Sequence, residues 1–330
     1  MRFVSAADVE ELGLSNAELL DAVEDAVRLQ GDGRALLEPR MHLQPPNEGA
    51  GHFNVLRGWL GDPEPDGVAG VKVVGDFFGN YQLGLPSEPA LITLFDPRTG
   101  VPLAIVDGTL ITSARTGALT AIGARHLARR DSRVLGHLGS RGTAWWNVVL
   151  LDAEFDFDEI RVTSRRAESR ESFAAALSDE LGKPVRAVAT AEETLVGADI
   201  MVEATRLTEP QPLVRTAWVE PGTFVVPYGT VSAVELDLLD VMDKVVVDDW
   251  GQADAGPFGA LRRHVDSGRL TQENLHAELG DIVAGHASGR ERPDERILFW
   301  HRGLSTTDVA LAQLVWRRAE EAGLGTLLPV

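Results

Sequence analysis

The sequence contains no cysteine. Disulfide bonds, thiolate nucleophiles and cysteine-ligated zinc are therefore excluded, and nothing indicates the redox compartment. No apolar run approaches the roughly 18 residues of a transmembrane helix. The N-terminal sequence MRFVSAAD also lacks the apolar segment of a signal peptide. We therefore expect a soluble, cytoplasmic protein without a membrane partner.

Basic residues are scarce. The chain has 31 Lys and Arg against 50 Asp and Glu, which gives a formal net charge of −19. Such a surface repels phosphate backbones, so no nucleic-acid partner is expected. An anionic small molecule would need a local group of basic residues that acts against this field.

Motifs of hydrolases and metalloenzymes are absent as well. The sequence contains neither H-E-x-x-H nor G-x-S-x-G. His276 and His286 lack a recognised ligand spacing, so no metal site is expected.

A chain of 330 residues is longer than one hydrophobic core usually supports, which predicts two domains. The first helix is expected to follow Ser15, with Glu18 as its capping-box partner and Gly31 just past its end. Strands are expected at 68–74, 90–95 and 101–106, and the last two form a hairpin around the turn-rich segment 96–100. Together with a helix at 112–129, they predict a mostly antiparallel α+β unit.

The pattern then changes to short apolar strands that alternate with helices. The strands are predicted at 134–138, 160–164, 185–188, 198–205, 223–226, 244–247 and 297–300, and a final helix at 305–321. This alternation indicates an α/β fold with a doubly wound parallel sheet of the Rossmann type.

A glycine turn follows the strand 134–138 and precedes a helix. Its pattern is G-x-x-G-x-A from Gly139 to Ala144, with Arg141 in place of the usual second glycine. This context is typical of a dinucleotide-binding turn, where backbone amides and a helix N-terminus bind a pyrophosphate. A tight strand-to-helix turn without a ligand is the alternative.

The tip of the next strand indicates which dinucleotide would bind. It reads Thr163-Ser164-Arg165-Arg166 and has no acidic residue for a ribose 2′-hydroxyl. Two arginines suit the 2′-phosphate of NADP, whereas cations at a helix N-terminus are otherwise unfavourable. The alternative is that both arginines are solvated.

Several separated segments together resemble the ornithine cyclodeaminase and mu-crystallin family. The matching segments, in order, are EPRMHL (38–43), GVKVV (70–74), LFDPRTGVPLAIVDG (94–108), TSARTGALTAIGARHLA (112–128), the glycine turn, PGT (221–223), VVVDDWGQA (245–253), ELGDIVAG (278–285) and the G-x-x-x-x-D of 303–308. They span nearly the whole chain, so the combination is far more specific than any one motif.

The resemblance implies a homodimer of two-domain subunits. Residues 1–128 and 302–330 would form the substrate-binding and dimerisation domain, with the Rossmann domain, 129–301, inserted between them. Arg40, Lys72 and Arg115 would bind the carboxylate of an amino-acid-like substrate. The residues expected to contact the dinucleotide are Thr112, Arg115, Gly139, Ser140, Arg141, Gly142, Thr143, Ser164, Arg165, Arg166 and Thr205.

The residues themselves support part of this pocket. Lys72 lies inside an apolar strand, where a lysine is seldom buried without a partner or a task. Arginine binds a carboxylate through two parallel hydrogen bonds, and lysine can serve as a point charge or proton donor. The alternatives are that Lys72 reaches solvent at a sheet edge and that Arg115 makes a surface ion pair.

Three features depart from the family pattern. Arg141 stands in the glycine turn, beside Thr143 where a glutamine is common. The cyclodeaminase aspartate has no counterpart in Gly229-Thr230-Val231, and Glu235 and Asp237 are expected further on, in the next helix. Trp300-His301-Arg302 replaces small residues, so His301 becomes an acid/base candidate, with a histidine bonded to backbone as the alternative. His42 is a second such candidate.

These features predict an oxidoreductase that uses NADP, or NAD as second choice, on a small imino or amino acid, as ketimine reductases and amino-acid dehydrogenases of this family do. Lys72 or His301 would carry the proton. One alternative is a cyclodeaminase-type ammonia-lyase with bound NAD and a displaced carboxylate such as Glu235. Another is a non-catalytic homologue that binds a nucleotide or another ligand. Selectivity would depend on Phe53, Phe77, Phe78, Tyr81 and Trp300, unless these aromatics belong to the core.

Overall fold

The computed structural model of the chain describes residues 1–46, 51–61 and 67–329. Its internal contacts divide the chain into two compact units: the first unit, residues 1–116 with 303–330, and the second unit, residues 117–302. The boundary falls within helix α3 (Thr109–Leu127), whereas the sequence predicted it after that helix.

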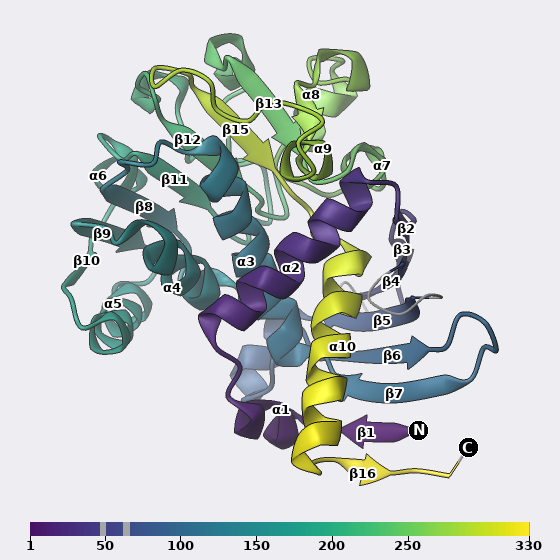
Figure 1. Ribbon diagram of the computed structural model, residues 1–330. Coiled ribbons are helices and arrows are strands. Elements are labelled where there is room, and N and C mark those ends of the chain that lie inside the picture. The colour runs from purple at the N-terminus through teal and green to yellow at the C-terminus, as the bar shows by residue number, and fades with distance from the viewer. Residues whose placement is uncertain (47–50, 62–66, 330) are drawn as a thin grey trace. The chain divides into compact units, whose positions relative to one another are not determined.

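The first unit is built on one sheet (Figure 1). The strand order is β16-β1-β7-β6-β5-β4-β2, and β3 also pairs with β4. Strands β4 to β7 are mutually antiparallel and β1 runs parallel to β7, so the predicted mostly antiparallel unit is confirmed. The strands are β1 (Arg2–Val4), β2 (Ala35–Leu37), β3 (Met41–Leu43), β4 (His52–Leu60), β5 (Val68–Asp76), β6 (Ala90–Phe95), β7 (Pro102–Asp107) and β16 (Thr326–Leu327).

Helices cover one face of this sheet. Helix α10 (Ser305–Ala322) packs on β4 and β5, and α2 (Asn16–Gly31) packs on α10. The capping box of Ser15 and Glu18 is confirmed, but Gly31 is the last helical residue and not the residue beyond the helix. A short helix that was not predicted, α1 (Ala6–Leu12), precedes α2 and has its own capping box of Ser5 and Asp8.

The opposite face of the sheet carries an apolar row. Met41, Val55, Val73 and Leu91 lie opposite one another in register across β3, β4, β5 and β6. Met41 is 59% exposed, Val73 43% and Leu91 49%. Because successive side chains of a strand point to opposite faces, the neighbours Lys72 and Ile92 point to the side of α10.

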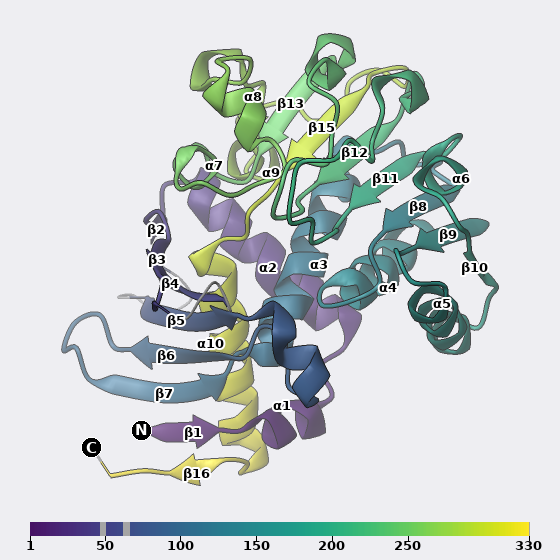
Figure 2. The same cartoon turned by 180° about the vertical axis from the view of Figure 1, so that it is seen from behind.

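The second unit is built on an all-parallel sheet (Figure 2). The strand order is β10-β9-β8-β11-β12-β15-β13-β14. The first five strands have the order 3-2-1-4-5 of a Rossmann sheet, with the topological switch point between β8 and β11. The strands are β8 (Val134–Leu138), β9 (Glu159–Thr163), β10 (Val185–Ala187), β11 (Ile200–Glu203), β12 (Phe224–Pro227), β13 (Lys244–Val247), β14 (Ala277–Glu278) and β15 (Ile297–Trp300). The predicted doubly wound fold is confirmed.

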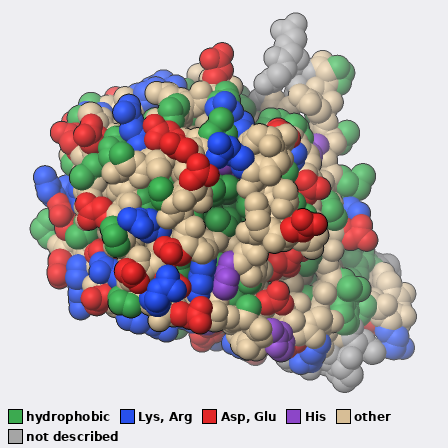
Figure 3. Space-filling view, turned by 90° about the horizontal axis from the view of Figure 1, so that it is seen from above, with side chains coloured by type: hydrophobic (Ala, Val, Ile, Leu, Met, Phe, Trp, Pro, Cys, Tyr) green, Lys and Arg blue, Asp and Glu red, His purple; other side chains and the backbone are tan. Residues whose placement is uncertain are grey.

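Helices connect these strands. They are α4 (Ala144–Phe155), α5 (Ala167–Leu181), α6 (Ala191–Leu195), α7 (Trp250–Asp254), α8 (Arg262–Asp266) and α9 (Leu279–Val283), with 3-10 turns at Thr216–Trp218, Leu238–Val241 and Gln272–Asn274. None of the helices in the described part of the chain combines the length and apolarity that a membrane span requires. Acidic and basic side chains are intermixed over the face drawn in Figure 3, with no unbroken basic surface there.

Candidate active site

Two cationic side chains of the first unit meet at one carboxylate. Lys72 Nζ on β5 donates to Asp308 Oδ1 from 2.7 Å, and Arg115 Nε on α3 donates to the same oxygen from 2.9 Å. Lys72 and Asp308 are buried, with side chains 1% exposed, and Arg115 is 8% exposed. Asp308 Oδ2 is also buried and has no hydrogen-bond partner among the described residues. The cluster therefore contains two cations, one anion and one unused acceptor.

Lys72 neither reaches solvent nor lies at a sheet edge. β5 is flanked by β4 and β6, and the side chain points to the side of α10. Burial and, to a lesser extent, the Arg115 charge lower the pKa of Lys72 to about 7, and Asp308 opposes both effects. A lysine with this pKa can both hold and release a proton near neutral pH.

Arg115 is fixed by a glycine. A Cβ added at Gly303 would lie 1.9 Å from Arg115 Nη1, and Gly303 has a φ of +84°. Arg40 reaches the same place, because its Nη2 donates to the Gly303 carbonyl from 3.0 Å. The structure thus brings together the three predicted carboxylate-binding residues, Arg40, Lys72 and Arg115. Thr112, predicted to contact the dinucleotide, lies 3.4 Å from Lys72 Nζ.

The other candidates of the first unit lie in different surroundings. Phe53 and Phe77 contact each other edge to face, with ring centroids 5.2 Å apart, and Phe78 and Tyr81 are both 42% exposed. His42 lies beside His52, with ring centroids 5.5 Å apart.

In the second unit, the glycine turn has the backbone that a phosphate site needs. Gly139 and Gly142 have φ values of +113° and +59°, and a Cβ at Gly139 would lie 2.8 Å from the Ala204 carbonyl oxygen. The amides of Ser140 and Gly142 have no hydrogen-bond partner among the described residues. Unpaired amides at the start of a helix form a ready site for an anion. The residues present therefore fit a dinucleotide pyrophosphate.

A third arginine lies close to the two that were predicted at the tip of β9. Arg165 and Arg166 are exposed, and Ser164 is half-buried beside them. Arg170, in the first part of α5, donates to the Ser164 carbonyl from 3.3 Å. Sequence reasoning missed Arg170, although its place one helical turn after Arg166 could have revealed it.

A buried polar network lies beneath the glycine turn. His137 Nδ1 lies 3.0 Å from the Gly139 carbonyl oxygen, and Asn147 Nδ2 lies 3.1 Å from His137 Nε2. Asn147 Nδ2 also donates to the Tyr228 hydroxyl, which lies 2.5 Å from Thr143 Oγ1. His137 and Asn147 are fully buried. Tyr228 lies beside Gly229, in the segment where cyclodeaminases were expected to carry their aspartate.

Glu203 fixes the position of Tyr228 and Gly229. Its carboxylate accepts hydrogen bonds from Thr205 N at 2.7 Å, Thr205 Oγ1 at 2.5 Å and Gly229 N at 3.3 Å, and its carbonyl accepts from Tyr228 N at 2.9 Å. Burial raises the pKa of Glu203 to about 7, although these hydrogen bonds favour the ionised form. Thr205, a predicted dinucleotide contact, therefore has its hydroxyl proton directed at Glu203.

His301 is buried next to Tyr228. Its ring centroid lies 4.6 Å from that of Tyr228, and Nε2 lies 2.9 Å from Thr120 Oγ1. His301 Nε2 therefore contacts a side-chain hydroxyl. Trp300 is fully buried within the apolar core of the second unit.

A family model described as the ornithine cyclodeaminase/mu-crystallin family matches residues 1–323. The chain belongs to this family. The predicted membership is therefore confirmed over almost the whole chain.

The full-length relatives of this chain include dehydrogenases and reductases. Alanine dehydrogenase of Archaeoglobus fulgidus is 33% identical over 322 residues, 97% of this chain and 95% of that one. The structure of Thermococcus litoralis Delta(1)-pyrroline-2-carboxylate reductase in complex with NADH and L-proline gives a TM-score of 0.91 at 30% identity, covering 99% of this chain and 100% of that one. An archaeal alanine dehydrogenase dimer with bound NAD gives a TM-score of 0.89 at 32% identity, covering 100% and 99%. These names agree with the predicted class, an NAD(P)-dependent oxidoreductase acting on C–N bonds.

One prediction for the missing family aspartate was wrong. Glu235 and Asp237 lie in a loop before the 3-10 turn at 238–241 and not in a helix. Glu235 accepts a hydrogen bond from Thr216 N at 2.9 Å, and Asp237 accepts one from Thr216 Oγ1 at 2.6 Å. Both carboxylates therefore bind Thr216, the first residue of a 3-10 turn. The segment that carries them is not helical, so helix periodicity does not set their positions.

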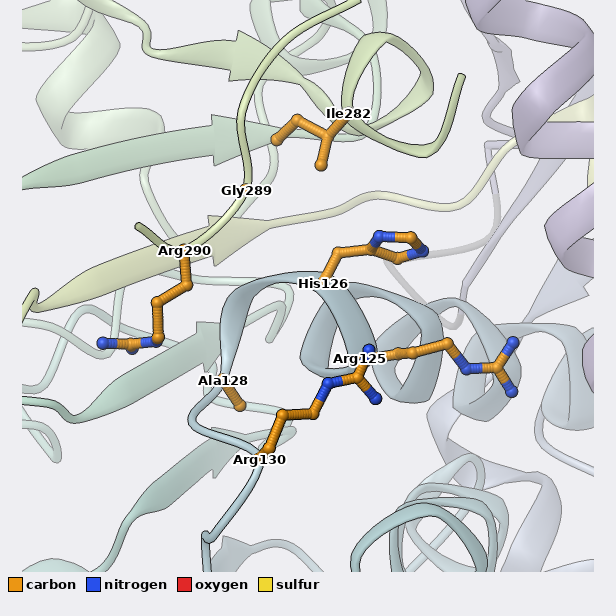
Figure 4. A pocket seen from close by; sticks show the side chains of 7 residues that line it. All are labelled: Arg125, His126, Ala128, Arg130, Ile282, Gly289 and Arg290. Carbon is orange, nitrogen blue, oxygen red and sulfur yellow. The ribbon is translucent and has the colours of Figure 1, made fainter. Parts of the chain in front are cut away.

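Two of the basic residues around a cavity of the second unit, Arg125 and Arg290, are paired within the protein. A cavity of about 290 Å³ in the second unit is lined by Arg125, His126, Ala128, Arg130, Ile282, Gly289 and Arg290 (Figure 4). Its cationic side chains point in different directions. Arg125 forms a two-fold ion pair with Glu154 at 2.6 and 2.9 Å, and Arg290 donates to backbone carbonyls of Leu127 and Glu295.

Proposed function

We propose that this chain is an NADP-preferring oxidoreductase that interconverts a small imino acid and the corresponding amino acid. The observation that carries the proposal is the buried Lys72, which shares Asp308 with Arg115 and has a pKa of about 7. A bound nicotinamide cofactor supplies or accepts the hydride at the C=N carbon.

Residues of the first unit can bind the substrate carboxylate and supply the proton. Arg40 and Arg115 bind the substrate carboxylate, because guanidinium groups match its two oxygens. Lys72 gives its proton to the imine nitrogen, so that hydride and proton together convert C=N into CH–NH. Asp308 Oδ2, which has no partner among the described residues, accepts a hydrogen bond from that nitrogen.

The test is Lys72→Ala, assayed with NADPH and a panel that includes pyrroline-2-carboxylate and pyruvate with ammonia. We expect turnover to be lost while the Kd for NADPH stays unchanged. Lys183→Ala is the matched control, since Lys183 belongs to the second unit and pairs there with Asp152 and Asp156. Full activity of Lys72→Ala would refute the assignment of the proton to this residue. Tight NADPH binding without turnover of any substrate would support the non-catalytic alternative.

The preference for NADP rests on the tip of β9, where Arg165 and Arg166 are exposed and no carboxylate stands in the segment 163–166. NADPH should bind more tightly than NADH, and Arg165→Ala with Arg166→Ala should remove the preference. Arg186→Ala is the control, because this arginine pairs with Glu159 on the neighbouring strand. A preference for NADH in the wild type would contradict this part of the proposal.

The carboxylates considered for the cyclodeaminase alternative are engaged with other groups of the protein. Glu235 and Asp237 both bind Thr216, and Gly229-Thr230-Val231 contains none. Release of ammonia from a diamino acid without net change of the nucleotide would favour that alternative.

We further propose that the outer apolar row of Met41, Val55, Val73 and Leu91 binds a second copy of this chain. A two-fold contact would remove the exposed side chains of Met41, Val73 and Leu91 from water, and the similar archaeal alanine dehydrogenase is a dimer. Val73→Lys with Leu91→Lys should lower the mass measured by light scattering to that of a monomer. Leu83→Lys, outside the row and 73% exposed, should leave the mass unchanged.

A further inference from the structure

In the buried network beneath the glycine turn, a donor and an acceptor can be assigned to each hydrogen bond in sequence. His137 Nδ1 faces a carbonyl oxygen, which can only accept, so this nitrogen carries the proton. Burial lowers the pKa of His137 to about 4, so the ring is neutral and Nε2 is an acceptor. Asn147 must then present its amide nitrogen to Nε2, which fixes the orientation of the side-chain amide.

The second proton of the Asn147 amide goes to the Tyr228 oxygen. Either hydroxyl can donate across the 2.5 Å contact between Tyr228 and Thr143 Oγ1, and we take the arrangement in which Tyr228 donates its phenolic proton to Thr143. The hydroxyl proton of Thr143 is then left to point away from the network. This order assigns one donor and one acceptor to every contact, from the Gly139 carbonyl at one end of the turn to Thr143 at the other.

The behaviour of Thr143 at the helix start agrees with this order. Thr143 is the N-cap residue of α4, yet its side chain makes no capping hydrogen bond, whereas a threonine there usually accepts from a backbone amide of the first turn. Its oxygen is engaged by Tyr228 instead. The Thr143 hydroxyl therefore does not cap α4, and it can donate a hydrogen bond close to the unpaired amides of Ser140 and Gly142.

We propose that Tyr228, held by Asn147 and His137, is a positioning residue that fixes the Thr143 hydroxyl as a hydrogen-bond donor to the pyrophosphate of the dinucleotide. This inference rests on the proposed function, because it presupposes that the turn binds a dinucleotide. It assigns a role to a residue that stands in the segment of the missing aspartate. It also explains how a turn with Arg141 in place of glycine keeps a directed donor for phosphate.

The anchoring of Tyr228 supports the assignment. Tyr228 N donates to the Glu203 carbonyl and Gly229 N to the Glu203 carboxylate. A Cβ at Gly229 would lie 2.6 Å from Glu203 Oε2, so only glycine permits this close approach. The loop after β12 is therefore locked to the end of β11, next to the switch point where Rossmann folds bind their ligand.

The experiment measures the Kd for NADPH and for ADP-ribose, which keeps the pyrophosphate but lacks nicotinamide. Trp145 and Trp146 at the start of α4 provide a fluorescence signal near the turn. Thr143→Val should raise both Kd values about tenfold or more, whereas Thr143→Ser should bind like the wild type. Tyr228→Phe should raise both values several-fold.

The decisive result is the double variant. If Tyr228 acts through Thr143, Tyr228→Phe should have almost no effect on Kd in the Thr143→Val background. A purely structural role would weaken binding equally in both backgrounds and would overturn the inference, as would an unchanged Kd in Tyr228→Phe. Wild-type protein that binds neither ligand would refute the proposed function itself, and this outcome is recognisable before any variant is made.

Discussion

Lys72 and Arg115 donate to the same oxygen of Asp308, Oδ1, from 2.7 and 2.9 Å. Two buried cations thus share one carboxylate oxygen, and the burial and the second cation together hold the Lys72 pKa near 7. The proton on Lys72 is therefore kept in place chiefly by Asp308.

Asp308→Asn should move the pH profile of imine reduction. The change removes the negative charge that raises the pKa of Lys72, so this pKa should fall below about 7. Because reduction needs the protonated amine, the loss of kcat/KM at alkaline pH should begin at a lower pH than in the wild type. Glu320→Gln, an exposed carboxylate on the same helix, should keep the wild-type profile. An unmoved alkaline limb in Asp308→Asn would contradict the proposed proton transfer.

Lys72 should also make stability depend on pH. Its pKa is about 7 in the folded protein, against 10.5 for a lysine exposed to water, so between these values the unfolded chain binds a proton that the folded chain lacks. Stability from this group therefore rises with pH across that window. Relative to Lys72→Met, the wild type should gain about 2 kcal/mol of unfolding free energy between pH 7 and 9 in urea titrations. A difference that is the same at both pH values would show that the lysine is not desolvated.

Glu203 should give the opposite trend. Its pKa is raised from 4.5 to about 7, so the folded chain keeps a proton that the unfolded chain has lost. The contribution of this group falls as the pH rises from about 4.5 through 7. Glu203→Gln lacks this loss, and should gain about 2 kcal/mol relative to the wild type between pH 5 and 7.5. The exposed Glu180→Gln serves as the control, and a flat difference for Glu203→Gln would mean that the acid is ionised throughout.

Gly303→Ala should damage substrate binding more than folding. The new Cβ would meet Arg115 Nη1 at 1.9 Å and displace the guanidinium, so the KM for the imino acid should rise at least tenfold. Gly33→Ala is the matched control, because Gly33 has a similar φ of +68° and no atom within 4 Å of the added Cβ. Both variants should lose about 1 kcal/mol or more to the left-handed backbone. Equal KM values for the two variants would show that Gly303 does not position Arg115.

Some parts of the site could be predicted because a residue type conflicts with its surroundings. Lys72 lies in an apolar strand, and the structure shows it buried and paired. The same argument applies to His137 in VLGHL and to Glu203 in IMVE, both of which sequence reasoning passed over. Asp308 was seen only as the end of a motif, since nothing near it in the sequence names its partners.

Contacts between residues that are distant in the sequence could not be predicted from the sequence. Asp308 lies 236 residues from Lys72, and Thr143 lies 85 residues from Tyr228. Such pairs form only when strands and helices pack, and no local pattern records them. The short helix α1 was missed because seven residues give too little periodicity.

The sequence by itself determined most of the second sheet, the strands β5 to β7 of the first sheet, the glycine turn and the arginines at the tip of β9, because these depend on local periodicity and on the conformations that glycine permits. Only the tertiary structure decided that Lys72 and Arg115 share Asp308 and that Tyr228 meets Thr143. Hydrogen-bond partners in a buried site are chosen by the packing of distant segments, since each buried polar group must find its partner within the fold.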